Sequence, residues 1–213
     1  MTGLGLLALV ACGVTRVDGA IDGQPVEVAN ATYAEVPGLF GDDGAILIWL
    51  LPGDDACGTL GRWFGVSEAS RDPVELANQW NTTFPSEFWQ VDLVLRVADP
   101  LQSTSGVWLE GTAWDANTEV AGQVYADLQH HLTSRDERFF SGDVSDPDAW
   151  FLRWYSHRGL LQIHRHQPGQ SLSGVFTTEA ADPDTGARQG EIVIRFAADH
   201  CAELDAIFAR GGT

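Results

Sequence analysis

The sequence predicts a mainly β protein: one antiparallel β-sandwich or barrel-like domain with a few short helices, including one at the C-terminus. Short apolar segments recur at roughly even spacing, and turn-forming residues separate them, which is typical of all-β folds. Hydrophobic residues make up 44% of the 213 residues, which is a globular composition. A chain of this length supports one core, and no internal repeat or linker divides it.

Two strands are expected early in the domain. A strand region begins at Val26 and Val28. Segment 44–51 is continuously apolar, has the length of a strand and ends at Pro52-Gly53. We therefore expect this second strand to be buried on both faces.

Two helices should follow these strands. The Asp54-Asp55 pair can cap a short helix that carries Cys57, because an aspartate side chain accepts hydrogen bonds from the first free amides. The Asp72-Pro73 pair is a good start for a second helix, since proline at the first helical position has its φ angle preset. This helix should run to about residue 80.

The clearest strand is segment 88–99, in which apolar and polar residues alternate with period 2. Its apolar face consists of Trp89, Val91, Leu93, Leu95 and Val97, and Gln90, Asp92 and Arg96 lie on the other face. Segment 107–113 repeats the alternation. After a turn at 115–118, segment 120–129 is expected to complete a hairpin, although its apolar spacing also fits a helix.

The C-terminal part is expected to contain a loop, two hairpins and a helix. Segment 135–148 is charged and predicts a long loop. Segments 150–157 and 160–164 predict a hairpin around Arg158-Gly159, and segments 172–179 and 190–198 predict a second antiparallel pair. Asp199 can cap a final helix at 201–209.

The charge is strongly acidic: 12 arginines and no lysine stand against 30 aspartates and glutamates, which gives a net charge of −18. Such a surface repels phosphate backbones, so we expect no nucleic-acid partner. The sequence also has no basic cluster that would hold anionic lipid headgroups.

The N-terminal segment 4–11 is apolar and uncharged and leads to Cys12. The residues Leu9-Val10-Ala11-Cys12 resemble the lipobox of bacterial lipoproteins, and the layout of the chain is similar to that of small outer-membrane lipoproteins. The resemblance implies that residues 1–11 are a signal peptide, that Cys12 is acylated, and that the lipid holds the protein at the cell envelope. Gly13 after the cysteine favours the outer membrane. The alternative is an ordinary first strand of a soluble cytoplasmic β-domain.

Residues 12–23 are rich in glycine and are interpreted as a tether before a domain that spans 24–213. If Cys12 carries lipid, Cys57 and Cys201 are the two remaining thiols. In an oxidising compartment these two predict one disulfide, and the alternative is a pair of buried free thiols.

Two groups of residues are candidate sites. His164 and His166 would share one face of a strand, and His157 across the expected turn could supply a third ligand for zinc or copper. The alternative interpretation is an exposed polar face. Trp108 and Trp114 alternate with Glu110 and could stack on a sugar ring if their face is wet. The alternative is that a helix or loop covers that face.

The sequence carries no motif for nucleophilic catalysis, phosphate binding or dinucleotide binding. We expect a membrane-anchored envelope protein with a binding or structural role, without catalysis and without a cofactor. Its partners would be the membrane, through the lipid, and an envelope protein or glycan. The alternative is a periplasmic metal-dependent or carbohydrate-acting enzyme, or a carbohydrate-binding module.

Overall fold

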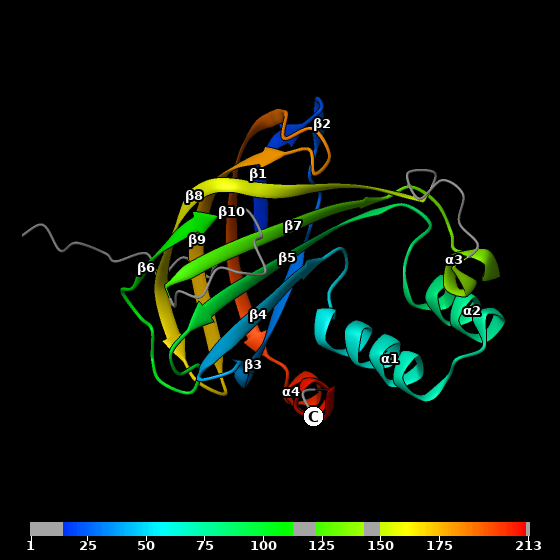
Figure 1. Ribbon diagram of the computed structural model, residues 1–213, viewed down its shortest axis with the longest axis horizontal. Coiled ribbons are helices and arrows are strands. Elements are labelled where there is room, and N and C mark those ends of the chain that lie inside the picture. The colour runs from blue at the N-terminus through cyan, green and yellow to red at the C-terminus, as the bar shows by residue number, and fades with distance from the viewer. Residues whose placement is uncertain (1–14, 113–121, 143–149, 212–213) are drawn as a thin grey trace, which may run out of the picture.

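The computed structural model describes residues 15–112, 122–142 and 150–211, and its strands form one large mixed sheet that curves back on itself (Figure 1). The strands are β1 (Arg16–Ile21), β2 (Gln24–Pro25), β3 (Asn30–Phe40), β4 (Asp43–Leu51), β5 (Phe88–Val97), β6 (Trp108–Thr112), β7 (Gln123–His131), β8 (Phe151–Gln167), β9 (Ser171–Ala181) and β10 (Arg188–His200). The helices are α1 (Ala56–Ala69), α2 (Pro73–Thr83), α3 (Glu137–Ser141) and α4 (Ala202–Gly211). The expected mainly β, barrel-like class with a C-terminal helix is confirmed.

The sheet closes because β9 and β3 both pair with β10. Strands β3, β4, β5, β7, β8, β9 and β10 form a ring in which every neighbouring pair is antiparallel except β10 and β3. A ring with an odd number of strands cannot close through antiparallel pairs alone, so one parallel seam is required. The seam is short and pairs residues 198–200 with residues 31–33.

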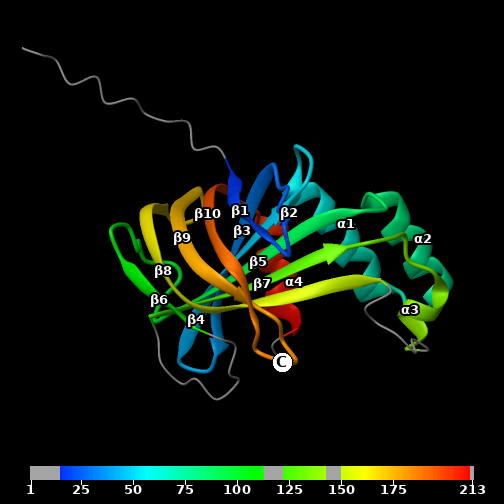
Figure 2. The ribbon, with the colours of Figure 1, turned by 90° about the horizontal axis from the view of Figure 1, so that it is seen from above.

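The sheet has an apolar layer on each side of β4. Ile46, Ile48 and Leu50 face the interior of the ring and belong to its core. Leu47 and Trp49 face outward and pack with side chains of the helices. The prediction of a strand buried on both faces is therefore confirmed. The four helices gather on one side of the molecule (Figures 1 and 2).

The expected helix starts are also confirmed. The Asp55 carboxylate accepts a hydrogen bond from the Gly58 amide at the start of α1, and Asp72 accepts one from the Val74 amide at the start of α2. Helix α1 extends to residue 69 and is longer than the short helix expected. In the described residues, no helix is long and apolar enough to cross a membrane.

Cys57 and Cys201 form a disulfide, as predicted, with their Cα atoms 5.6 Å apart. Cys57 lies in the first turn of α1, and Cys201 lies between the end of β10 and α4. The bond therefore ties the helical side of the molecule to the end of the strand that closes the sheet. Cys12 and residues 1–11 lie outside the described residues.

The expected tether is wrong from residue 16 onward, because residues 16–21 form β1, which pairs with the first half of β10. Ile21 is buried, and Val17 packs against the interior core. The glycine that suggested flexibility has a different role. A Cβ at Gly19 would lie 2.7 Å from the Glu191 carbonyl oxygen, so this position needs glycine for close contact between strands.

The expected hairpin around Arg158-Gly159 is wrong, because β8 runs unbroken from residue 151 to 167. The pairing with β9 shifts register between Ser156 and Gly159, which marks a β-bulge. A Cβ at Gly159 would lie 2.2 Å from the Thr177 carbonyl oxygen. The glycine therefore permits contact with β9 and does not form a turn.

The expected hairpin between segments 107–113 and 120–129 is also wrong. Segment 123–131 is a strand and not a helix, but β6 pairs with it in parallel through residues 110 and 111. Parallel strands cannot be joined by a tight turn. Strand β6 instead lies between β7 and β8 and pairs antiparallel with β8. The predicted turn at 115–118 lies outside the described residues.

The segment 135–148, predicted as a loop, contains the short helix α3. The Asp136 carboxylate accepts a hydrogen bond from the Arg138 amide and caps its start. Arg135, directly before this helix, is buried and not solvated as its place in a charged segment suggested.

Candidate functional site

A cavity of about 380 Å³ lies at one end of the closed sheet, where β2, the segment after β4 and the first residues of β5 meet. Its lining is formed by Gln24, Pro25, Glu27, Pro52, Glu87, Phe88, Trp89 and His130. The cavity therefore combines aromatic and proline surface with two carboxylates and one imidazole. This mixture of apolar walls and a few polar groups is typical of small-ligand sites.

The His130 imidazole is fixed in the wall of this cavity. Its ring stacks on Trp89 with the centroids 4.4 Å apart, and Trp89 in turn stacks on Trp154. The Nε2 atom lies 3.2 Å from Oε1 of Glu87 and donates to it. The Nδ1 atom is buried and has no hydrogen-bond partner. The cavity thus offers two exposed carboxylates, those of Glu27 and Glu87, to a ligand that carries N–H or O–H donors.

A second polar group lies on the outer face of the sheet, where Asp92 of β5 pairs directly with Asp127 of β7. Residues opposite one another in antiparallel strands have their Cβ atoms about 4.5–5.5 Å apart. The Arg153 guanidinium donates from Nε to both Asp127 oxygens, at 2.9 and 3.1 Å. The Gln90 side chain donates to both Asp92 oxygens at 2.9 Å.

The two carboxyl groups have different hydrogen-bond partners. Burial and the neighbouring charge of Asp127 raise the pKa of Asp92 from 3.8 to about 8. Asp127 remains the carboxylate partner of Arg153, and hydrogen bonding to Asp127 raises the pKa of that arginine. A carboxyl group with a strongly raised pKa therefore lies beside a carboxyl group that is paired with an arginine, which is a feature of sites that bind or transfer protons.

We expect the Asp92→Asn variant to lose a pH dependence of stability that the wild-type protein shows. The folded state holds a proton on Asp92 between about pH 4 and pH 8, and the unfolded state does not, so the stability of the wild-type protein falls as pH rises through this window. Urea denaturation at pH 5, 6 and 7 measures the free energy of unfolding of both proteins. The value for the variant should rise relative to that of wild type by about 1.4 kcal/mol per pH unit.

The exposed Asp184→Asn variant is the control and should follow wild type at every pH. A constant difference between wild type and Asp92→Asn across this range would show that Asp92 is ionised in the folded protein.

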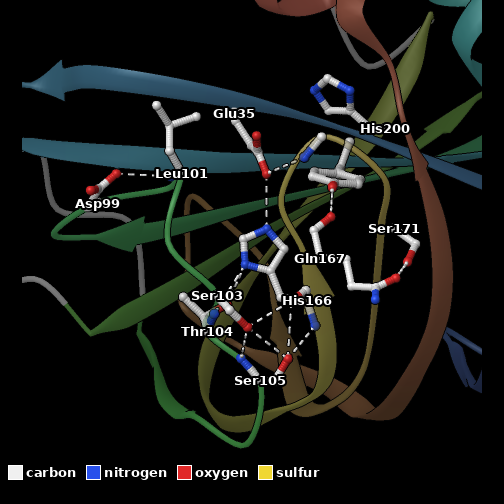
Figure 3. Close-up of polar contacts among 12 residues, drawn as sticks. Glu35, Asp99, Leu101, Ser103, Thr104, Ser105, His166, Gln167, Ser171 and His200 are labelled. Carbon is white, nitrogen blue, oxygen red and sulfur yellow. Dashed lines mark hydrogen bonds and ion pairs between the residues drawn. The ribbon is translucent and has the colours of Figure 1, made fainter.

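His166, one of the predicted metal ligands, is instead the centre of a buried network (Figure 3). Its Nδ1 accepts a hydrogen bond from the Thr104 amide at 3.2 Å, so its Nε2 carries the proton and donates to Oε1 of Glu35 at 3.0 Å. The Thr104 hydroxyl lies 3.0 Å from the same Nδ1. The Ser103 hydroxyl donates to the His166 carbonyl oxygen, and Ser105 Oγ accepts from its amide.

This order of hydroxyl, imidazole and carboxylate is also that of nucleophilic triads. The Nδ1 acceptor of His166, however, is already occupied by the Thr104 amide, and the side chains of His166 and Glu35 have 0% and 3% exposure, so the imidazole is not free to take a proton from a hydroxyl group. The network instead fastens segment 103–105 to the interior of the closed sheet. We assign it a structural role.

The predicted metal ligands are not brought together. The register shift between Ile163 and Arg165 is a bulge that breaks the alternation, so His164 is exposed while His166 is buried. His157 is also exposed, in the bulge of β8. In the described part of the chain, no group of three or more His, Cys, Asp or Glu side chains could hold a metal ion.

The predicted sugar-stacking face is partly described. Trp108 is 55% exposed and Glu110 is exposed, while Leu109 between them is buried. Trp108 and Glu110 therefore share a solvent-exposed surface on β6. The alternative, in which a helix or loop covers this face, is wrong for these two residues. Trp114, the third residue of this group, lies outside the described residues.

The chain matches no protein-family model, and no curated protein or solved structure is significantly similar to it. The chain is therefore described by its fold and by these sites. It is an acidic domain built on a closed sheet, braced by a disulfide, with helices on one side and a small polar cavity at one end of the sheet.

Proposed function

We propose that this chain is an exported protein of the cell envelope, anchored by a lipid on Cys12, that binds a small polar ligand through its folded domain. The observation that carries the proposal is the disulfide between Cys57 and Cys201. Disulfides persist in oxidising compartments outside the cytosol. The resemblance of residues 9–12 to a lipobox supports the anchor, since an acylated cysteine holds a water-soluble domain at a membrane.

The cavity at the end of the sheet supports a binding role. The exposed carboxylates of Glu27 and Glu87 line the cavity, can both accept hydrogen bonds and give it negative charge. A ligand with amine or hydroxyl donors would satisfy these groups. The cell envelope supplies such donors on glycans and on proteins, which we propose as partner classes.

A second candidate function is a carbohydrate-acting enzyme, and the Asp92–Asp127 pair favours it. Retaining glycosidases use one protonated and one ionised carboxyl group about 5–5.5 Å apart. Both Asp127 oxygens, however, already accept hydrogen bonds from Arg153. This makes Asp127 a weak nucleophile, so the pair is better suited to holding hydroxyl groups than to hydrolysis. Release of nitrophenol from chromogenic glycosides, abolished in Asp92→Asn, would support the enzyme instead.

Processing of the N-terminus tests the export proposal in the cell that makes the protein. Wild-type protein should sediment with membranes, and Cys12→Ala should leave a full-length precursor that still carries residues 1–11. Inhibition of the lipoprotein signal peptidase with globomycin should also block removal of residues 1–11.

The control is the Cys57→Ser, Cys201→Ser double variant, which should be processed like wild type. If the Cys12→Ala variant has the same size and membrane association as wild type, the anchor proposal is wrong.

A further inference from the structure

Arg135 is a buried cation without an acidic partner in the described part of the chain, although the sequence contains 30 acidic residues. Only 2% of the surface of Arg135 is exposed. The guanidinium carbon lies within 6 Å of four aromatic ring centroids, those of Phe139 at 4.4 Å, Trp80 at 5.4 Å, Phe151 at 5.5 Å and Trp150 at 5.8 Å. Aromatic faces attract a cation but do not neutralise its charge.

The position of Arg135 is fixed by its backbone and by part of its side chain. The Asn81 side chain of α2 accepts from the Arg135 amide at 2.8 Å and donates to its carbonyl oxygen at 2.6 Å. The Nη1 atom donates to the Trp150 carbonyl oxygen at 2.7 Å, and Nη2 donates to Nδ1 of His131 at 2.6 Å. The arginine is therefore held inside the protein by specific contacts.

Three N–H groups around this arginine are buried and have no acceptor: Nε of Arg135, Nε2 of His131 and Nε1 of Trp80. His131 accepts through Nδ1, so its proton is on Nε2. The three side chains are neighbours, since the Trp80 ring lies 5.3 Å from the His131 ring and 5.4 Å from the Arg135 guanidinium. Each buried donor without an acceptor destabilises the folded protein, because its hydrogen bond to water is lost and not replaced.

The charges of these groups favour an anion as the missing acceptor. Burial lowers the pKa of Arg135 to about 10, which leaves it a cation at neutral pH. Burial and the Arg135 charge lower the pKa of His131 to about 3, which keeps His131 a neutral donor. An unpaired buried charge destabilises the folded protein, because the charge has lost its hydration. An oxyanion would supply both the countercharge and the acceptor atoms.

We propose that Arg135, His131 and Trp80 form a binding site for an oxyanion, the carboxylate or phosphate group of a ligand. The site lies beside the end cavity, on the opposite face of the sheet. His131 is adjacent to His130 on β7, and its ring stacks on Phe88, which also lines the cavity, with the centroids 4.3 Å apart.

Calorimetric titration of the purified full chain with sodium phosphate and, separately, with sodium acetate tests the site, with ionic strength held constant by sodium chloride. Wild-type protein should bind one of these anions saturably at one site and show a higher thermal unfolding midpoint in its presence. The anion that binds identifies whether phosphate or carboxylate is recognised. Arg135→Gln should weaken binding about 100-fold, because it removes the charge, and Trp80→Phe about tenfold, because it removes one donor.

Two matched controls should bind like wild type. Arg138→Gln removes the exposed arginine of α3, and Trp63→Phe makes the same change in the ring that packs against Trp80 at 4.9 Å. If wild type binds neither anion, or if both Arg135→Gln and Trp80→Phe bind as tightly as wild type, the proposal is wrong. Should Arg135→Gln fail to fold, Trp80→Phe against Trp63→Phe decides the question.

Discussion

Replacement of Cys57 and Cys201 by serine is expected to lower the free energy of unfolding by about 4 kcal/mol. The disulfide closes a loop between residues 144 positions apart, and chain-entropy estimates assign about 4.7 kcal/mol to a 100-residue loop. Strain in the folded state reduces such values, which sets our lower figure. Urea denaturation of the non-reduced proteins measures the loss.

Wild-type protein with its disulfide reduced is the control, and it should be destabilised by a similar amount. We expect the loss of protection from hydrogen exchange to be greatest in α1 and α4, the helices beside the two cysteines. A double variant within about 1 kcal/mol of wild type would show that the bond does not brace the fold.

Replacement of His166 by alanine is expected to lower the free energy of unfolding by about 3–5 kcal/mol. The substitution leaves the Glu35 carboxylate buried without its imidazole donor, while the Gly169 amide at 3.2 Å still donates to it. It also removes the acceptor of the Thr104 amide. Removal of one partner from a buried pair costs more than the pair contributes, because the other partner stays desolvated.

His164→Ala is the matched control, since His164 is exposed on the same strand, and we expect it to stay within about 0.5 kcal/mol of wild type. Equilibrium urea denaturation compares the two variants at the same pH. Equal, small effects of both substitutions would show that the network around His166 does not hold segment 103–105 in place.

The features that the sequence predicted correctly depend on local patterns. The alternation in segment 88–97 and the continuous apolar run at 44–51 report burial directly, and both strands lie where expected. The Asp72-Pro73 pair indicates the start of a helix, and this signal needs only a few consecutive residues. The disulfide was predicted from the cysteine count and from the expected oxidising compartment, without any knowledge of the fold.

The incorrect predictions concern contacts between distant segments. Gly159 has the sequence signature of a turn, but its role is to allow close contact with Thr177 on another strand. The parallel pairing of β6 with β7 depends on the position of β8, which no local pattern reveals. One bulge separated His164 from His166, and a one-residue change of register moves side chains to the opposite face.

The candidate sites were only partly predictable for the same reason. The alternation placed Asp92 on the polar face of its strand, but its partner Asp127 became identifiable only through the register between β5 and β7. Arg135 lies in a charged segment that suggested a solvated loop. Its burial depends on α2, which contributes Trp80 and Asn81, and on residues of β8. A charge pattern alone gives no signal for such a site.

The most direct test of the proposed function is the mass of the N-terminal peptide of the protein, extracted with detergent from membranes of the cell that makes it. The proposal predicts a peptide that begins at Cys12 and carries the added mass of a diacylglyceryl group and a further acyl chain. A peptide that begins at Met1, with an unmodified Cys12, would contradict it.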